Sequence, residues 1–145
     1  MSFNPKKQLE QFLSEDIGKG DITSALLPKK IISANIISRQ KAILGGSKYA
    51  KEIFTLKGCK VRIITKDGSK MKPNQIIMKI TGNADKILTC ERTALNIITR
   101  MSGIATQTNE LVKKIPKKTK LYATRKTAPG LRYFDKEAVE IGGGK

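Results

Sequence analysis

Cationic and acidic side chains are the groups in this sequence that could do chemistry, because the chain has no histidine. Its 145 residues include 29 lysines and arginines and 12 acidic residues, a net charge of +17. Without histidine there is no Ser-His dyad, no histidine metal ligand and no imidazole base. The positive charge favours an anionic partner, and nucleic acid, an acidic membrane surface, phosphates and carboxylates all remain candidates on charge alone.

Three stretches combine charged residues with glycine, proline and hydroxyl residues in a fixed order along the chain. They are Glu15–Ser24 with Leu27 and Pro28; Glu91–Asn96 running to Ser102–Thr106; and Ala123–Arg132, followed by Lys136, Ala138, Val139 and Gly142–Gly144. In this order and spacing they resemble the quinolinate phosphoribosyltransferase family over nearly the whole chain. Between them, Asp67–Gly82 looks like the biotinyl-type hairpin of that family.

The resemblance implies an α/β fold class with two parts. Residues 1–97 would form an N-terminal α/β sandwich domain, and residues 98–145 would begin an α/β barrel that is left incomplete in this chain. The His-Arg pair, the later lysine and the acidic and glycine-rich phosphate sites that follow the triple glycine in the family are absent here. We therefore expect the 145-residue polypeptide to be inactive alone.

The implied reaction is that of a pentosyltransferase of NAD biosynthesis. A phosphoribosyl group passes from phosphoribosyl pyrophosphate to the nitrogen of quinolinate, with decarboxylation, giving nicotinate mononucleotide, pyrophosphate and CO2. The implied cofactor is Mg²⁺, with its ligands expected beyond Lys145. The implied assembly is a homodimer, or an oligomer built from dimers.

The resemblance also implies the site residues. Quinolinate is a planar dicarboxylate, and a guanidinium offers a forked pair of donors that an ammonium lacks. Arg92 and Arg125 would bind it, Arg92 by reaching into the neighbouring subunit's site. Thr124, Arg125 and Lys126 would lie beside the substrate at the end of a barrel strand, with Lys126 as the catalytic residue near the leaving carboxylate. Arg132 is a weaker candidate, for which a structural pairing is the alternative.

The neighbouring positions of Arg125 and Lys126 leave one question open. Adjacent side chains in a strand point to opposite faces, so one of the two could be an ordinary surface charge. A loop at the strand end would relax that alternation.

Hydrophobic periodicity and turn residues predict the elements that must position these residues. We expect a helix ending near Asp16, and a turn and helix cap at Asp21, Thr23 and Ser24. The other expected elements are strands over 31–37 and 42–44, a turn at 45–46, a helix over 47–56, strands over 61–64 and 76–80, one long helix over 84–115 or a pair broken at Gly103, a strand over 120–124, and a short helix over 136–141.

Composition places the chain among soluble globular proteins, with 39% hydrophobic and 28% charged residues. No apolar run suits a signal peptide or a membrane helix, so we expect a cytoplasmic protein without a membrane partner. Cys59 and Cys90 form no C-x-x-C pair, which favours two free thiols in a reducing compartment.

Three other functions compete with this interpretation. A related phosphoribosyltransferase-like protein of molybdenum transport would use another acceptor. The basic run Lys113–Lys120 could belong to a nucleic-acid-binding module, but aromatic residues make up only 5% of the chain, which disfavours base stacking. The third alternative is a truncated, non-catalytic subunit that dimerises and donates Arg92 to an intact partner.

Overall fold

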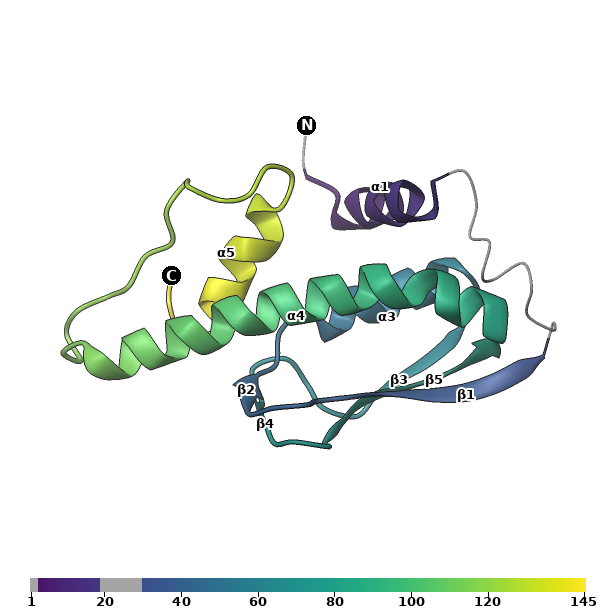
Figure 1. The fold of residues 1–145 in the computed structure, drawn as a ribbon. Helices are drawn as coiled ribbons and strands as arrows, with labels where there is room; N and C mark the ends of the chain where they lie inside the picture. The colour runs from purple at the N-terminus through teal and green to yellow at the C-terminus, as the bar shows by residue number, and fades with distance from the viewer. Residues whose placement is uncertain (1–2, 19–29) are drawn as a thin grey trace.

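The computed structural model describes residues 3–18 and 30–145, as five strands and four helices (Figure 1). The predicted turn at Asp21, Thr23 and Ser24 lies outside these residues. In chain order the elements are α1 Pro5–Ile17, β1 Ile31–Ile37, β2 Ala42–Ile43, α3 Ser47–Leu56, β3 Lys60–Ile63, β4 Lys70–Met71, β5 Ile76–Asn83, α4 Ala84–Lys114 and α5 Arg132–Ile141.

The strands form a three-stranded sheet with the order β1-β5-β3 and a small ladder of β2 with β4, all antiparallel. β1 pairs with β5 from Ile31 opposite Asn83 to Ile36 opposite Met78, and the register shifts at Ile37. The helices α3 and α4 lie over one face of the sheet (Figure 1). Exposed and half-buried residues alternate along β1, as a strand with one covered face requires.

The long helix α4 is the axis of the molecule. Its 31 residues give it a length of about 46 Å at the usual rise per residue. It runs unbroken through Gly103, so of the two expectations for this segment the single helix is confirmed. It also passes without interruption through the predicted domain boundary between residues 97 and 98, a division that stays a prediction.

Two hydroxyl residues of the stretch Ser102–Thr106 hold the segment before α3 against α4. The Ser102 hydroxyl accepts a hydrogen bond from the Gly45 N–H at 3.0 Å, and the Thr106 hydroxyl accepts one from the Ile43 N–H at 2.9 Å. A Cβ on Gly45 would come within 3.1 Å of the Met101 backbone, so the close approach requires glycine there. These two hydroxyls therefore serve the fold.

One hydrophobic core joins the sheet to all four helices. Leu9 of α1, Phe54 of α3 and Met101 of α4 belong to the same buried cluster as Phe134 and Ala138 of α5. Aromatic rings extend the cluster toward the surface, with Phe3 stacked on Tyr133 at a centroid distance of 4.6 Å and Tyr49 edge-on to Phe134 at 4.9 Å. The last helix is thus packed into the same core as the sheet.

The segment after α4 corrects two predictions. Residues 120–124 do not form a strand, and the last helix begins at Arg132, four residues before the predicted Lys136. Among the described residues this segment has one backbone partner outside it: Lys145 donates its N–H to Leu121 O at 2.8 Å, and Lys145 O accepts from the Ala123 N–H at 2.7 Å. Lys145 follows α5, and its two partners precede α5. The two bonds have the pattern of parallel strands, but they involve Lys145 alone on one side and so do not make a strand.

Within residues 3–18 and 30–145, none of the helices combines the length and the apolar character that spanning a membrane requires.

Candidate functional site

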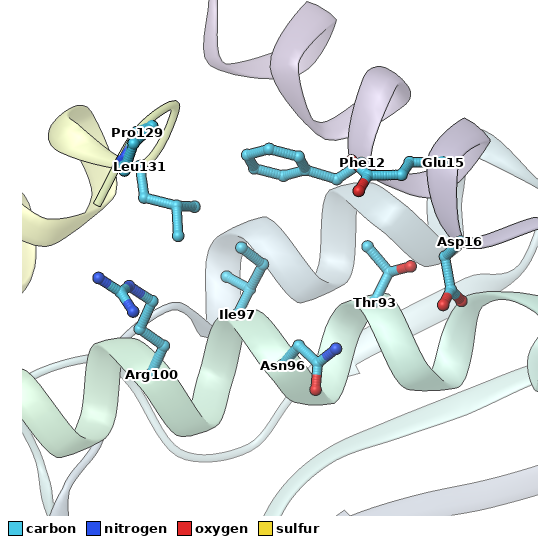
Figure 2. A pocket seen from close by; sticks show the side chains of 9 residues that line it. All are labelled: Phe12, Glu15, Asp16, Thr93, Asn96, Ile97, Arg100, Pro129 and Leu131. Carbon is cyan, nitrogen blue, oxygen red and sulfur yellow. The ribbon is translucent and has the colours of Figure 1, made fainter.

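A cavity of about 520 Å³ lies between α1, α4 and the turn that precedes α5. We call it the α1–α4 cavity. Three parts of the chain contribute to its lining: in Figure 2 the residues of α1 lie above, those of α4 lie below, and those of the turn lie at one side. Its lining is Phe12, Glu15, Asp16, Thr93, Asn96, Ile97, Arg100, Pro129 and Leu131.

Arg92 of α4 precedes the lining residue Thr93 in the sequence and forms an ion pair with the lining residue Asp16. Its Nη1 is 3.2 Å from Asp16 Oδ1, and its side chain is 72% exposed. An exposed ion pair of this kind contributes at most about 1 kcal/mol. The guanidinium can therefore exchange Asp16 for another carboxylate at little cost.

Thr124, Arg125 and Lys126 are exposed in a segment without regular secondary structure. The Lys126 N–H donates to Thr124 Oγ1 at 3.1 Å, so the chain bends at Arg125. A bend of this type removes the strict alternation of a strand, and both cations can face one ligand. Within the described residues no carboxylate forms an ion pair with either cation.

Arg132 is the first residue of α5 and is exposed. None of the ion pairs among the described residues includes it, so the structural pairing considered from the sequence is not observed in this part of the chain.

None of the four cationic candidates is among the residues that line the α1–α4 cavity. Asp16, the ion-pair partner of Arg92, lies at one end of the lining, and Pro129 and Leu131 lie at the other (Figure 2). In the part of the chain that the structure describes, no hydrogen bond or ion pair joins Arg92 to the segment 124–126.

Two groups beside the candidates escaped the sequence analysis. Arg100 of α4 forms an ion pair with Asp135 of α5 through two hydrogen bonds. Arg100 lines the cavity, and Asp135 donates its N–H to Leu131 O in the turn that lines it. Thr93 is 5% exposed, and its hydroxyl has no partner among the described residues. A charged residue inside an otherwise apolar helix stripe, such as Asp135 beside Phe134 and Ala138, was the available signal.

A further polar cluster joins α3 to α5. The Tyr49 hydroxyl donates to Glu137, whose other carboxylate oxygen is 2.6 Å from Lys48 Nζ. Burial, followed by the hydrogen bond to Glu137, raises the pKa of Tyr49 well above the ordinary tyrosine value. Tyr49 therefore stays a neutral donor to a charged acceptor.

The cysteines are free and buried, as predicted. Burial, with a smaller effect of the neighbouring Cys59, raises the pKa of Cys90 to about 12. A thiol with so little thiolate is a poor nucleophile, so neither cysteine enters the candidate site.

No three His, Cys, Asp or Glu side chains gather into a metal site in the described ranges 3–18 and 30–145. Mg²⁺ usually binds through one or two carboxylates together with substrate phosphates and water, so it does not need such a cluster.

Comparison with known proteins gives matches along nearly the whole chain. Residues 21–102 match the sequence model of the quinolinate phosphoribosyl transferase N-terminal domain, and residues 104–145 match that of its C-terminal domain. A probable nicotinate-nucleotide pyrophosphorylase [carboxylating] of Archaeoglobus fulgidus is 44% identical over 128 residues, covering 86% of this chain and 49% of the relative. The corresponding Bacillus subtilis protein is 41% identical over 143 residues, covering 96% and 50%.

Solved structures give the same result. Nicotinate-nucleotide pyrophosphorylase from Francisella tularensis superposes with a TM-score of 0.90 at 41% identity, over 97% of this chain and 51% of that one. NadC from Streptococcus pyogenes superposes with a TM-score of 0.91 at 30% identity, over 99% and 54%. The predicted α/β fold class is confirmed, and the chain spans about half the length of the relatives it matches.

Proposed function

Because this chain belongs to the quinolinate phosphoribosyl transferase family, we propose that its protein transfers phosphoribosyl from phosphoribosyl pyrophosphate to quinolinate. The products would be nicotinate mononucleotide, pyrophosphate and CO2, for NAD synthesis. The observation that carries the proposal is the match to both domains of the family, in order, over residues 21–102 and 104–145.

The exposed cations support an anionic substrate. Arg125 and Lys126 share a bend and have no ion-pair partner among the described residues, and Arg92 holds Asp16 only by an exposed pair. A dicarboxylate can replace Asp16 on Arg92 and can occupy the fork of Arg125. In the proposed site Lys126 is the catalytic residue, placed beside the carboxylate that leaves.

The reaction needs positioned charge more than acid–base catalysis. Ribosyl transfer passes through a state with positive charge on the sugar carbon, so the cations mainly orient two anions and stabilise the departing pyrophosphate. Once the ring nitrogen is alkylated, its positive charge stabilises the electron pair that stays on the neighbouring ring carbon when CO2 leaves, and a proton from water then takes the place of the carboxylate on that carbon. No histidine is required for that step.

The proposed assembly is a homodimer in which Arg92 completes the partner's site. The proposed cofactor is Mg²⁺, with ligands outside the described residues. We place the protein in the cytoplasm, where a reducing environment keeps Cys59 and Cys90 free.

The first experiment follows CO2 released from carboxyl-labelled quinolinate by the native gene product, with phosphoribosyl pyrophosphate and MgCl2. We expect release that depends on phosphoribosyl pyrophosphate, and a loss of about tenfold or more in kcat/KM in Arg125→Lys, which keeps the charge but not the fork. Binding of quinolinate without CO2 release would contradict the proposed reaction. Salt-sensitive binding of nucleic acid in place of quinolinate would favour the basic binding module.

Mixing subunits tests the place of Arg92. In a heterodimer of Arg92→Ala and Lys126→Ala, one site receives an intact Arg92 from the partner and keeps its own Lys126. Random mixing of the two inactive variants should restore about a quarter of the wild-type rate, since half the dimers are mixed and each has one intact site. If mixing restores nothing, Arg92 acts within its own subunit, and its place in the partner's site is contradicted.

A further inference from the structure

Arg100 makes the most specific polar contact between α4 and α5. Its Nε donates to Asp135 Oδ1 at 2.7 Å and its Nη2 to Asp135 Oδ2 at 2.8 Å. Asp135 is only 7% exposed, and its hydrogen bonds are the main cause of a raised Arg100 pKa. A fork-to-fork pair of this kind fixes both distance and orientation.

Asp135 connects this pair to the segment that carries the candidate cations. Its N–H donates to Leu131 O at 2.9 Å, and the Leu131 N–H donates to Ala128 O at 3.0 Å. Ala128 follows Lys126 by two residues. Leu131 and Pro129 face Arg100 across the α1–α4 cavity (Figure 2). A short series of bonds therefore runs from α4 to the residues that directly follow Arg125 and Lys126.

The same helix carries Arg92. Eight residues separate Arg92 from Arg100, which is about 12 Å along an unbroken helix. Movement of α5 against α4 would thus change the placement of Lys126 relative to Arg92 and, in a dimer, the spacing between the two sites.

We propose that Arg100 is a positioning residue, which through Asp135 holds the segment 124–131 in the conformation that binds the substrate carboxylates. The inference rests on the proposed function for its ligand. The position of the segment, however, is a property of the chain alone.

The rest of α5 is held independently, which makes the proposal testable. Phe134 and Ala138 are fully buried in the core, and Glu137 is bound by Tyr49 and Lys48. Arg100→Lys keeps a positive charge and most of the aliphatic stem but loses the fork. The helix should stay folded, and only its first turn and the preceding segment should loosen.

Hydrogen exchange measures this directly. In Arg100→Lys the amides of Lys126, Leu131 and Asp135 should exchange about tenfold faster than in the wild type, while those of β1 and β5 keep their rates. Glu52→Gln is the matched control, because it removes an ion pair that joins α1 to α3 and includes no residue of α5, Lys6 with Glu52 at 3.3 Å. Unchanged exchange in 124–131 would overturn the proposal whether or not quinolinate binds.

Kinetics on the native gene product separates this role from general stability. We expect Arg100→Lys to raise the KM for quinolinate by about tenfold with a smaller change in kcat, and Asp135→Asn to do the same. The double variant should be no worse than either single one, since both break the same pair. Loosened exchange with an unchanged KM would overturn the link to the substrate. If the wild type neither binds nor converts quinolinate, the proposed function is wrong. The exchange rates then still show whether the pair of Arg100 and Asp135 holds the segment 124–131.

Discussion

The arginines of α4 differ in how firmly their charge is already bound. Arg100 gives two short hydrogen bonds to a buried carboxylate, whereas Arg92 gives one longer contact and is 72% exposed. Releasing the first would leave Asp135 buried and unpaired, which is costly; releasing the second costs little. Arg92 is therefore suited to exchange partners and Arg100 to hold one.

Tyr49 gives a prediction about alkaline pH. Replacing it with phenylalanine removes the hydrogen bond to Glu137 but leaves the Lys48 contact, so we expect a loss of about 1–2 kcal/mol at pH 8. Above about pH 10 an unfolded tyrosine ionises, while folded Tyr49, with its raised pKa, stays protonated. The unfolded state then binds fewer protons, so wild-type stability falls as the pH rises.

Urea unfolding of both proteins at pH 8 and pH 11 measures this effect. The stability difference between wild type and Tyr49→Phe should narrow by about 1 kcal/mol at the higher pH, because only the wild type carries the titrating group. The wild type is compared with its variant at each pH, so lysine titration cancels. A difference that stays constant would mean that Tyr49 also ionises in the folded state.

At the level of elements, two glycines on helices give opposite predictions for the same substitution. Gly103 lies inside α4 with nothing within 4 Å of an added Cβ, so alanine should stabilise the protein by about 1 kcal/mol through helix propensity. An alanine Cβ at Gly142, at the end of α5, would lie 2.5 Å from Ala105 O and 2.6 Å from Thr108 Cβ. Overpacking of this kind costs about 1–3 kcal/mol.

Each glycine variant is the control for the other, since both change glycine to alanine at right-handed helical φ and ψ. Chemical denaturation should give a higher midpoint for Gly103→Ala and a lower one for Gly142→Ala. A lower midpoint for Gly103→Ala would show that this open face of α4 packs against another chain or segment.

Elements with strong local signals were predictable from the sequence. The isoleucines of residues 31–37 and the glycine pair before Ser47 gave β1 and α3 the bounds that the structure shows. The predicted strand at 120–124 was wrong because pairing, and not local sequence, decides whether an extended segment is a strand. Within residues 3–18 and 30–145, Lys145 alone pairs with it. The short β4 was missed for a related reason, since two residues carry no alternation.

Some residues of the candidate site could be predicted from the sequence and others could not. Arg92, Arg125 and Lys126 lie in contiguous motifs and could be named from the sequence. The pair of Arg100 and Asp135 depends on how α5 crosses α4, which no local pattern encodes. Whether Arg92 belongs to its own site or the partner's is a property of an assembly, so the sequence motif predicts it only through resemblance.

At the scale of the whole molecule, one buried core is shared by the segments on both sides of the predicted domain boundary. Phe134 and Ala138 of α5 pack with Leu9 of α1 and Met101 of α4. α4 contributes to this core on both sides of residue 97. Separation at the predicted domain boundary would therefore expose apolar surface on both parts.

Charge is the other property of the whole molecule, and it predicts the response to salt. A net charge of +17 on 145 residues destabilises the compact state by self-repulsion. The opposing attractions are few, since the described residues form four ion pairs and only Arg100 with Asp135 buries a carboxylate. Salt screens distant exposed charges more than a short buried pair, because the Debye length falls from about 30 Å at 0.01 M to about 8 Å at 0.15 M.

Raising NaCl across this range should therefore increase the melting temperature by about 3 °C, the shift that corresponds to roughly 1 kcal/mol in a chain of this size. Calorimetry measures the melting temperature, and sodium phosphate at equal ionic strength is the control. A larger rise of the melting temperature in phosphate than in NaCl indicates anions bound at the exposed cations. A melting temperature that falls with NaCl would mean that the ion pairs outweigh the repulsion.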